Sequence, residues 1–101
     1  MKKLVVLYRT PEDTDAFMRY YREKHLPLAA TVPGLLRTEI TRINKTLVGA
    51  QDNFLLAELY FETEEAFAAA TKSPEFAATG ADLGNFAGGL ATVMIGEVME
   101  L

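Results

Sequence analysis

Two short apolar runs constrain the fold of this chain more than any other feature. Lys3–Tyr8 (KLVVLY) and Phe54–Phe61 (FLLAELYF) are rich in β-branched and aromatic residues, and apart from Glu58 their apolar residues do not alternate with polar ones. A strand with this pattern is typically covered on both faces. The two runs therefore predict buried strands at the centre of a sheet.

Two more strands and two helices are predicted around these runs. The strands are Leu35–Asn44, which is polar enough for a sheet edge, and Ala91–Leu101. One helix is predicted over Thr14–His25 with Asp13 as its N-cap, and another begins after Thr63, its N-cap. The order β-α-β-β-α-β predicts an α+β, ferredoxin-like fold with a four-stranded antiparallel sheet and both helices on one face. Right-handed crossovers then place the first and third strands in the middle.

This architecture leaves one face of the sheet uncovered, because two helices can cover only the other face. A single chain cannot then bury Val5, Leu7, Leu55 and Leu59 on both sides of the sheet. An exposed apolar sheet of this size usually marks an interface. The 101 residues are therefore predicted to form one domain, 1–101, that pairs with a second copy, the two sheets packing face to face as a barrel-like core.

The first helix carries the only histidine of the chain. Phe17, Tyr21 and His25 recur at i, i+4 and i+8, with Leu28 close behind, so His25 is predicted to point inward with the aromatic residues. Pro27 has no N–H group and disfavours a helical residue before it. The helix is therefore predicted to kink or stop just after His25, with a further turn through residue 30 as the alternative.

Two interpretations of His25 stay open at this stage. An imidazole titrates near neutrality, so a histidine that faces an apolar surface is a candidate general acid or base. A core histidine bonded to a backbone carbonyl gives the same pattern. A helix C-terminus favours the charged ring and burial favours the neutral ring, and the sequence does not decide between them.

A glycine-rich segment, Thr79–Gly89, precedes the last strand and contains four glycines. It is predicted to be the most flexible part of the chain, after a short helical turn over Pro74–Ala78. It does not match a phosphate-binding loop, because it lacks both the Gly-x-Gly-x-x-Gly pattern and a Gly-Lys-Ser/Thr ending, and it precedes a strand.

Composition argues against several classes of function. The net charge of −4 and the pI of about 4.9 disfavour a nucleic acid or an anionic membrane as the partner. The absence of cysteine and the single histidine leave no disulfide framework and no cysteine or multi-histidine metal site. A carboxylate-only Mg²⁺ or Ca²⁺ site stays open, but the sequence has no EF-hand spacing, and no metal is predicted. No apolar stretch is long enough for a signal peptide or a membrane span, which favours a soluble, cytoplasmic protein.

A longer motif around the first helix resembles the signature of EthD-like proteins. It reads Tyr8-Arg9-x-Pro11-x-Asp13-x-x-Ala16-Phe17-x-x-Tyr20-Tyr21-x-x-x-His25-x-Pro27-Leu28, followed by Val32-Pro33-Gly34-Leu35, with a weaker match at Asp82-Leu83-x-Asn85-Phe86. The resemblance implies a dimeric α+β barrel. The wider superfamily includes cofactor-free monooxygenases, muconolactone isomerases, polyketide cyclases and haem-binding proteins, and EthD itself is associated with ether degradation.

The resemblance also suggests site residues. It implies that His25 is the polar group of a pocket, with Tyr21 beside it and with Asp82, Asn85 and Phe86 on a covering loop. The other residues predicted to contact a ligand come from the first strand and the first helix, namely Tyr8, Phe17 and Leu28.

Three functions are compatible with these residues. The first is a small cofactor-independent enzyme with isomerase, cyclase or oxygenase chemistry on a small hydrophobic, oxygenated substrate, in a pocket between the first helix and the sheet. There His25 is the general acid or base, and Tyr21, or else Tyr20 or Tyr8, donates a hydrogen bond to the developing enolate.

The second function is a non-catalytic metabolite-binding or accessory protein of a degradation pathway. A paired-carboxylate site from Glu39, Glu58 and Asp82 is conceivable, although the two strand residues could equally be solvated or form cross-strand pairs. The third function, haem binding with His25 as axial ligand, ranks last because the histidine matches the EthD motif rather than a haem motif. No cofactor is predicted, and the predicted partners are a second copy of the chain and a small hydrophobic molecule.

Overall fold

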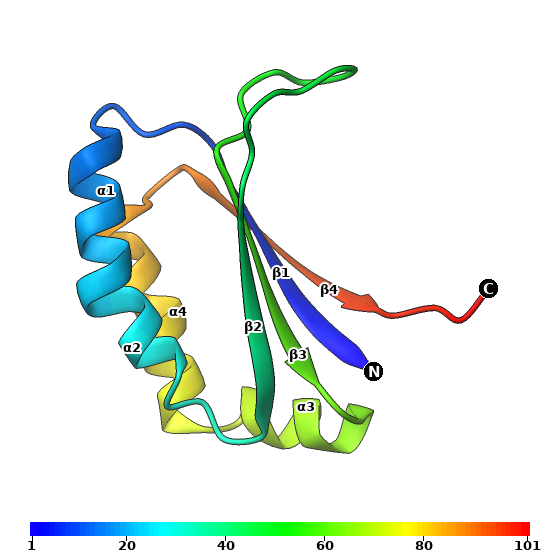
Figure 1. The fold of residues 1–101 in the computed structure, drawn as a ribbon. Coiled ribbons are helices and arrows are strands. Elements are labelled where there is room, and N and C mark those ends of the chain that lie inside the picture. Colours follow the sequence, from blue (N-terminus) through cyan, green and yellow to red (C-terminus); the bar gives the residue numbers. More distant parts are fainter.

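A computed structural model describes all residues, 1–101 (Figure 1). Its elements in chain order are β1 (Lys2–Tyr8), α1 (Thr14–Tyr20), η1 (Tyr21–His25), α2 (Leu26–Ala29), β2 (Leu35–Arg42), β3 (Leu55–Phe61), α3 (Glu64–Thr71), α4 (Pro74–Phe86) and β4 (Ala91–Glu97). None of the helices combines the length and the apolar character needed to span a bilayer.

The four strands form one antiparallel sheet in the order β2-β3-β1-β4. The predicted α+β, ferredoxin-like fold is therefore confirmed, with β1 and β3 in the middle and β2 at an edge. The edge strands are shorter than predicted, since β2 ends at Arg42 and β4 at Glu97.

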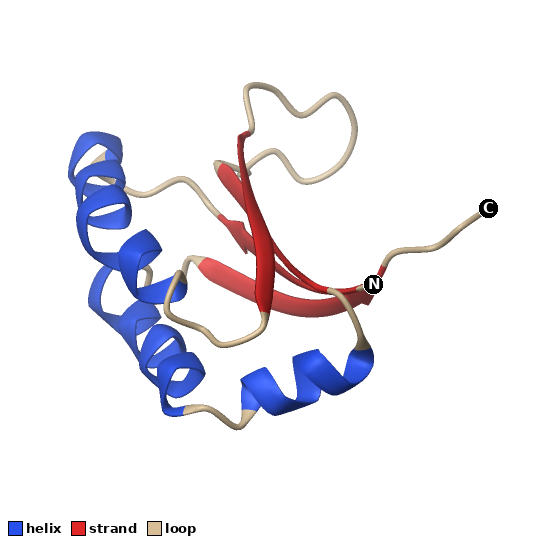
Figure 2. Ribbon diagram, turned by 60° about the horizontal axis from the view of Figure 1, so that its bottom comes forward, coloured by secondary structure: helices blue, strands red, loops and turns tan.

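The helices lie to one side of the sheet, and the other face is uncovered (Figures 1 and 2). Along β1, Val6 and Tyr8 point toward the helices and are buried. Their partners on β3, Ala57 and Leu55, are buried on the same face. Leu59 is also buried there, so both leucines that were predicted to need a second cover, Leu55 and Leu59, are enclosed by this chain's own helices.

The first helix does not stop at His25 but continues for a further turn, which was the alternative that the sequence allowed. A π-helical turn, η1, follows α1 directly, and the helix then continues as α2 to Ala29. In the π turn the N–H of Leu26 bonds to the carbonyl of Tyr21, five residues back. This wider turn shifts the hydrogen-bond register by one residue just before Pro27, so the missing N–H of proline does not break the helix. The imidazole of His25 is therefore inside a continuous helical segment, not at its end.

The glycine-rich segment is different from the prediction. Instead of a short turn and a flexible loop, residues 74–86 form a helix of 13 residues, α4. The hydroxyl of Ser73 accepts a hydrogen bond from the N–H of Phe76 at 3.1 Å, and Pro74 occupies the first turn. Phe76, Leu83 and Phe86 pack against the core. This burial outweighs the cost of interior glycines, which is about 1 kcal/mol each relative to alanine.

Candidate functional site

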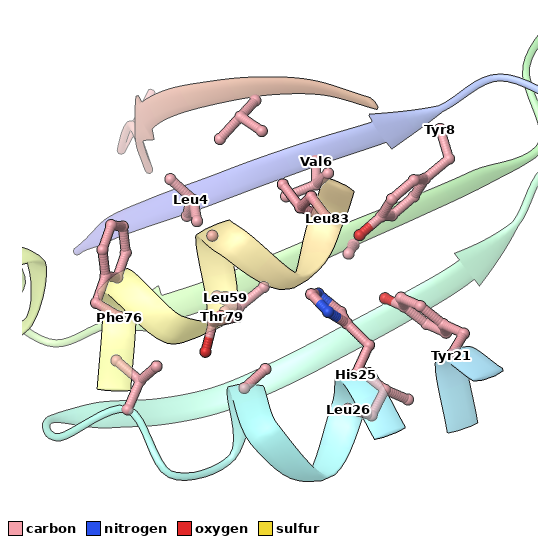
Figure 3. Close-up of a pocket in the computed structure, with 15 residues that line it drawn as sticks. Leu4, Val6, Tyr8, Tyr21, His25, Leu26, Leu59, Phe76, Thr79 and Leu83 are labelled. Carbon is pink, nitrogen blue, oxygen red and sulfur yellow. The ribbon is translucent and has the colours of Figure 1, made fainter. Parts of the chain in front are cut away.

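An apolar cavity of about 150 Å³ lies between the helices and the sheet. Twelve of the fifteen residues that line it are hydrophobic. The lining residues come from the first helix and the turn that follows it, from α4, β1 and β3, and from one residue of β4. Figure 3 shows Leu4 and Val6 of β1 above it, Leu83 of α4 beside it, and the His25 and Tyr21 side chains below. The cavity therefore presents few polar atoms to a ligand.

His25 is the main polar group of this cavity. Its side chain is buried, and its Nδ1 atom lies 2.9 Å from Oδ2 of Asp82 on α4. The ring packs against Phe86 with a centroid distance of 4.7 Å and stacks on Tyr21 at 5.6 Å. The histidine is thus bonded to a carboxylate rather than to a backbone carbonyl, and two aromatic rings restrict its orientation.

Asp82 receives three hydrogen bonds. Besides His25, the Tyr20 hydroxyl donates to Oδ1 at 2.6 Å, and the Asn85 amide donates to the same oxygen at 2.9 Å. Burial opposes ionisation of this carboxyl group, but the hydrogen bonds from Tyr20, Asn85 and His25 outweigh it and lower the pKa of Asp82. Asp82 is therefore a carboxylate at neutral pH.

The charge of Asp82 determines which nitrogen of a neutral His25 ring can act as a base. A carboxylate can only accept hydrogen bonds, so the proton of a neutral imidazole is on Nδ1 and the lone pair is on Nε2. The Nε2 atom has no hydrogen-bond partner in the protein. Every fully buried side-chain nitrogen or oxygen atom in the structure has such a partner, so Nε2 is not fully buried. The Nε2 lone pair is consequently accessible from the cavity.

Two tyrosines complete the polar part of the cavity wall. The rings of Tyr8 and Tyr21 are almost fully buried and meet edge to face at 5.6 Å, and their hydroxyl groups face the His25 side of the cavity (Figure 3). Burial raises the pKa of Tyr21 to about 12, although the Tyr8 hydroxyl partly offsets it. Burial also raises the pKa of Tyr8. Both hydroxyls therefore stay protonated at neutral pH and can donate hydrogen bonds.

The structure brings some of the predicted site residues together and separates others. His25, Tyr21 and Tyr8 line the cavity. Asp82 does not line it but forms a hydrogen bond with Nδ1 of His25. Leu28 does not line the cavity, because the face that includes His25 continues through Ala29, four residues on, with Leu26 beside it.

The remaining predicted residues lie on the other side of the His25 ring. Phe17, Asn85 and Phe86 border a separate surface groove together with Tyr20. Asp82, Asn85 and Phe86 are on the rigid helix α4, not on a loop, because that segment is helical. They support His25 instead of covering the cavity.

Sequence reasoning missed the contribution of α4 to the cavity wall, through Phe76, Thr79, Gly80 and Leu83. The signal was present as Ser73-Pro74, a helix start, followed by apolar residues at helical spacing. The glycines obscured it. The role of Tyr20 as a hydrogen-bond donor to Asp82 had no local signal, because the two residues are 62 positions apart.

The three carboxylates considered for a paired site do not gather in one place. Glu39 and Glu58 are cross-strand neighbours on the uncovered face, bound to Arg37 and Lys3 respectively, whereas Asp82 lies on the helix side. Nowhere in the structure do three or more acidic, histidine or cysteine side chains gather closely enough to hold a metal ion.

Comparison with known proteins places the chain in a family. The family model of the EthD domain matches residues 9–89. An uncharacterised 11.0 kDa protein from the thcB–thcC intergenic region of Rhodococcus erythropolis is 32% identical over 94 residues, which are 93% of this chain and 91% of that protein. The crystal structure of an EthD family protein from Bacillus halodurans is 40% identical, with a TM-score of 0.90 over 98% of this chain and 99% of that one.

A more distant likeness concerns the fold alone. The structure of SnoaB, a cofactor-independent oxygenase from Streptomyces nogalater, superposes with a TM-score of 0.70 at 16% identity, covering 99% of this chain and 94% of that one. The match over most of the chain and the two closer relatives agree with the motif around the first helix. The chain belongs to the EthD family.

Proposed function

We propose that this protein catalyses cofactor-independent proton transfer on a small, neutral, oxygenated molecule held in the apolar cavity. One observation carries the proposal: His25 lines the cavity with its Nδ1 atom bound to the Asp82 carboxylate, which leaves Nε2 without a partner in the protein. A positioned imidazole of this kind is suited to general acid–base catalysis.

The proposed reaction begins with removal of a proton from a carbon next to a carbonyl group. His25 Nε2 takes the proton, and the electron pair of the C–H bond moves into the carbonyl to form an enolate. Asp82 stabilises the resulting imidazolium at Nδ1. A hydroxyl of Tyr8 or Tyr21 donates a hydrogen bond to the enolate oxygen, and His25 returns the proton to the same or another carbon. No other reactant is consumed, so isomerisation follows directly.

The charge of the cavity wall limits the substrate. No lysine or arginine lines the cavity, and the one nearby charged group, Asp82, is a carboxylate that already accepts hydrogen bonds from Tyr20, Asn85 and His25. A carboxylate or phosphate on the substrate would lose its hydration without gaining a lysine or arginine as a partner of opposite charge. The substrate is therefore a neutral, mainly apolar molecule with one carbonyl or hydroxyl oxygen.

Cyclase and oxygenase chemistry could start from the same enolate. The likeness to SnoaB supports this variant only through the fold, because the two proteins share 16% of their residues. In an oxygenase the enolate would react with dioxygen instead of taking back the proton. The initial proton removal by His25 is common to all three reactions.

Exchange of substrate hydrogens for deuterium tests the proposal without knowledge of the natural substrate. Cyclohexanone is neutral and enolisable, so the protein in D₂O should exchange its α-hydrogens faster than buffer does, as followed by proton NMR. His25→Gln should reduce the catalysed rate at least about a hundredfold, which is the usual contribution of general base catalysis. Circular dichroism checks that the variant is folded. A variant as active as the unmodified protein would refute the role of His25.

The alternative is a protein that binds a metabolite in the same cavity without catalysis, as an accessory to a degradation pathway. The apolar wall favours binding of a neutral molecule whether or not chemistry follows. Binding of cyclohexanone, seen as a change in the His25 ring resonances, without any exchange would favour this alternative. Haem is not proposed as a ligand, since a porphyrin is far larger than the cavity.

The uncovered sheet face supports a homodimer as the functional form. Val5, Leu7, Leu56 and Met94 lie on this face, and the chain provides no helix to cover them (Figure 2). We infer that a second copy packs against it. Light scattering should give twice the mass of the 11.1 kDa chain, and a monomer at micromolar concentration would contradict the inference.

A further inference from the structure

We propose that Gly80 on α4 determines the size of the ligand, by leaving open the mouth of a cavity that accepts a single six-membered ring. This inference rests on the proposed function, because it concerns the substrate of the same cavity. Gly80 determines specificity because it has no side chain that would fill this space.

The position of Gly80 on the helix directs it toward the cavity. Phe76 is four residues before it and Leu83 three residues after it, and these spacings place all three on one helix face. All three line the cavity. A Cβ atom built on Gly80 meets no heavy atom within 4 Å. A side chain at position 80 would therefore extend into open space at the cavity wall.

Gly80 also lies where the cavity meets solvent. Most lining residues are buried or half-buried, but Gly80 and Val93 of β4 are exposed, and Val93 is 48% exposed. Both still line the cavity. Since the two residues come from α4 and β4, the mouth lies between these elements, and Figure 3 shows α4 along that side of the cavity. A side chain at position 80 would narrow this mouth as well as the space behind it.

The volume of the cavity indicates the size of ligand. A dry cavity of about 150 Å³ lined by leucine, isoleucine and phenylalanine is known to hold one benzene molecule. The cavity described here has the same volume and a similar lining. It therefore matches a single ring with an oxygen that reaches His25, and the three methyl or methine carbons of a valine would occupy much of that space.

Gly84 provides a matched control on the same helix. It is one turn beyond Gly80, and a Cβ atom built on it also meets nothing within 4 Å. Unlike Gly80, it does not line the cavity. Equal substitutions at the two positions change the helix propensity equally, so a difference between them reports the cavity.

The test compares cyclohexanone, which has one ring, with acetone, which has three carbons. Dissociation constants for both are measured from the shifts of the His25 ring resonances in Gly80→Val, Gly84→Val and the unmodified protein. Gly80→Val should weaken cyclohexanone binding at least tenfold and acetone binding less than twofold. Gly84→Val should leave both within twofold.

Alanine variants guard against a failure of the valine variants to fold. Gly80→Ala should weaken cyclohexanone binding about threefold while raising the melting temperature, as alanine is a better helix former than glycine. Gly84→Ala should raise the melting temperature without changing binding. The proposal is overturned if Gly80 variants bind cyclohexanone like the unmodified protein, if both ligands weaken equally, or if the unmodified protein binds no ring.

Binding and exchange separate this inference from the proposed function. Size-dependent binding without deuterium exchange would overturn proton transfer and leave the role of Gly80 standing. Exchange that depends on His25 but is unaffected by Gly80→Val would overturn the role of Gly80 and leave proton transfer standing.

Discussion

The two faces of the sheet are built from the same strands but differ in how far this chain buries them. On β1, Val6 and Tyr8 point toward the helices and are 5% and 1% exposed. Lys3 and Val5, which precede them in the chain, point to the uncovered face and are only partly buried. The alternation of one strand thus separates a dry interior, which contains the candidate site, from a surface available to a partner.

Charged groups on the two faces differ in their burial and in the number of their hydrogen bonds. On the helix face, the His25–Asp82 pair is buried, and Asp82 has two further donors. On the uncovered face, Lys3 pairs with Glu58 at 2.6 Å and Arg37 stacks over Tyr60 at 4.0 Å. Removing one partner of a buried pair leaves an uncompensated buried charge, whereas a partly exposed pair such as Lys3–Glu58 loses less when one partner is removed. The helix face should therefore be far more sensitive to substitution.

Adjacent leucines give the largest expected difference between the faces. Leu55 is 1% exposed on the helix face, and Leu56 is half-buried on the uncovered face. Leu55→Ala should cost about 3 kcal/mol of unfolding free energy, because it leaves a cavity in the packed core. Leu56→Ala should cost less than about 1 kcal/mol, as little apolar area is lost. Urea unfolding at low protein concentration measures both, and equal losses would contradict the distinction between the faces.

Asp82→Asn is expected to have the second largest effect. The substitution removes the negative charge to which Tyr20, His25 and Asn85 form hydrogen bonds. The free energy of unfolding at pH 7 should therefore fall by about 2 kcal/mol. Because the pKa of Asp82 is lowered in the folded state, the unfolded state binds more protons as the pH falls below about 4. The stabilisation is complete above that pH and is lost as the pH falls through the folded value.

The two unfolding curves should therefore converge in acid. The free energy of unfolding of the unmodified protein and of Asp82→Asn is measured with denaturant between about pH 3 and 7, in steps of about one pH unit. Glu58→Gln on the uncovered face is the matched control, since it also removes a paired carboxylate. A difference that stays constant across this range would show that Asp82 does not act through its charge.

Tyr20→Phe should have the smallest effect of the three. It removes one donor from Asp82 and leaves those from Asn85 and His25, so the loss of stability should be smaller than for Asp82→Asn. The pKa of the Asp82 carboxyl should rise, because the Tyr20 hydroxyl helps to keep it low. Carbon NMR of the side-chain carboxyl measures that pKa, and Tyr60→Phe is the control on the other face. An unchanged pKa would mean that Tyr20 does not help to keep Asp82 charged.

Much of the fold followed from local pattern. The apolar runs at 3–8 and 54–61 predicted the two central strands, and the spacing of Phe17, Tyr21 and His25 predicted the inward face of the first helix. Both patterns report which side of an element is buried, and that is a local property. The helix α4 was missed because its glycines resemble loop residues, and packing of Phe76 and Leu83 against the core overcame their low propensity.

The candidate site was only partly predictable, because only some of its contacts are local in the sequence. His25 and Tyr21 share a helix, so their proximity could be read from their spacing. The wider π turn before Pro27 was not predictable from propensity, since it depends on the packing of the whole helix.

The sequence by itself determined the order of elements, the central place of β1 and β3, and the inward direction of His25. The tertiary structure decided what His25 can do. Asp82 is 57 residues away in the chain, and only the packing of α4 against the first helix brings its carboxylate to Nδ1 and leaves Nε2 for the cavity. Local periodicity fixes which face of a helix is buried, but the choice of partner on that face depends on contacts between distant segments, and these exist only once the chain is folded.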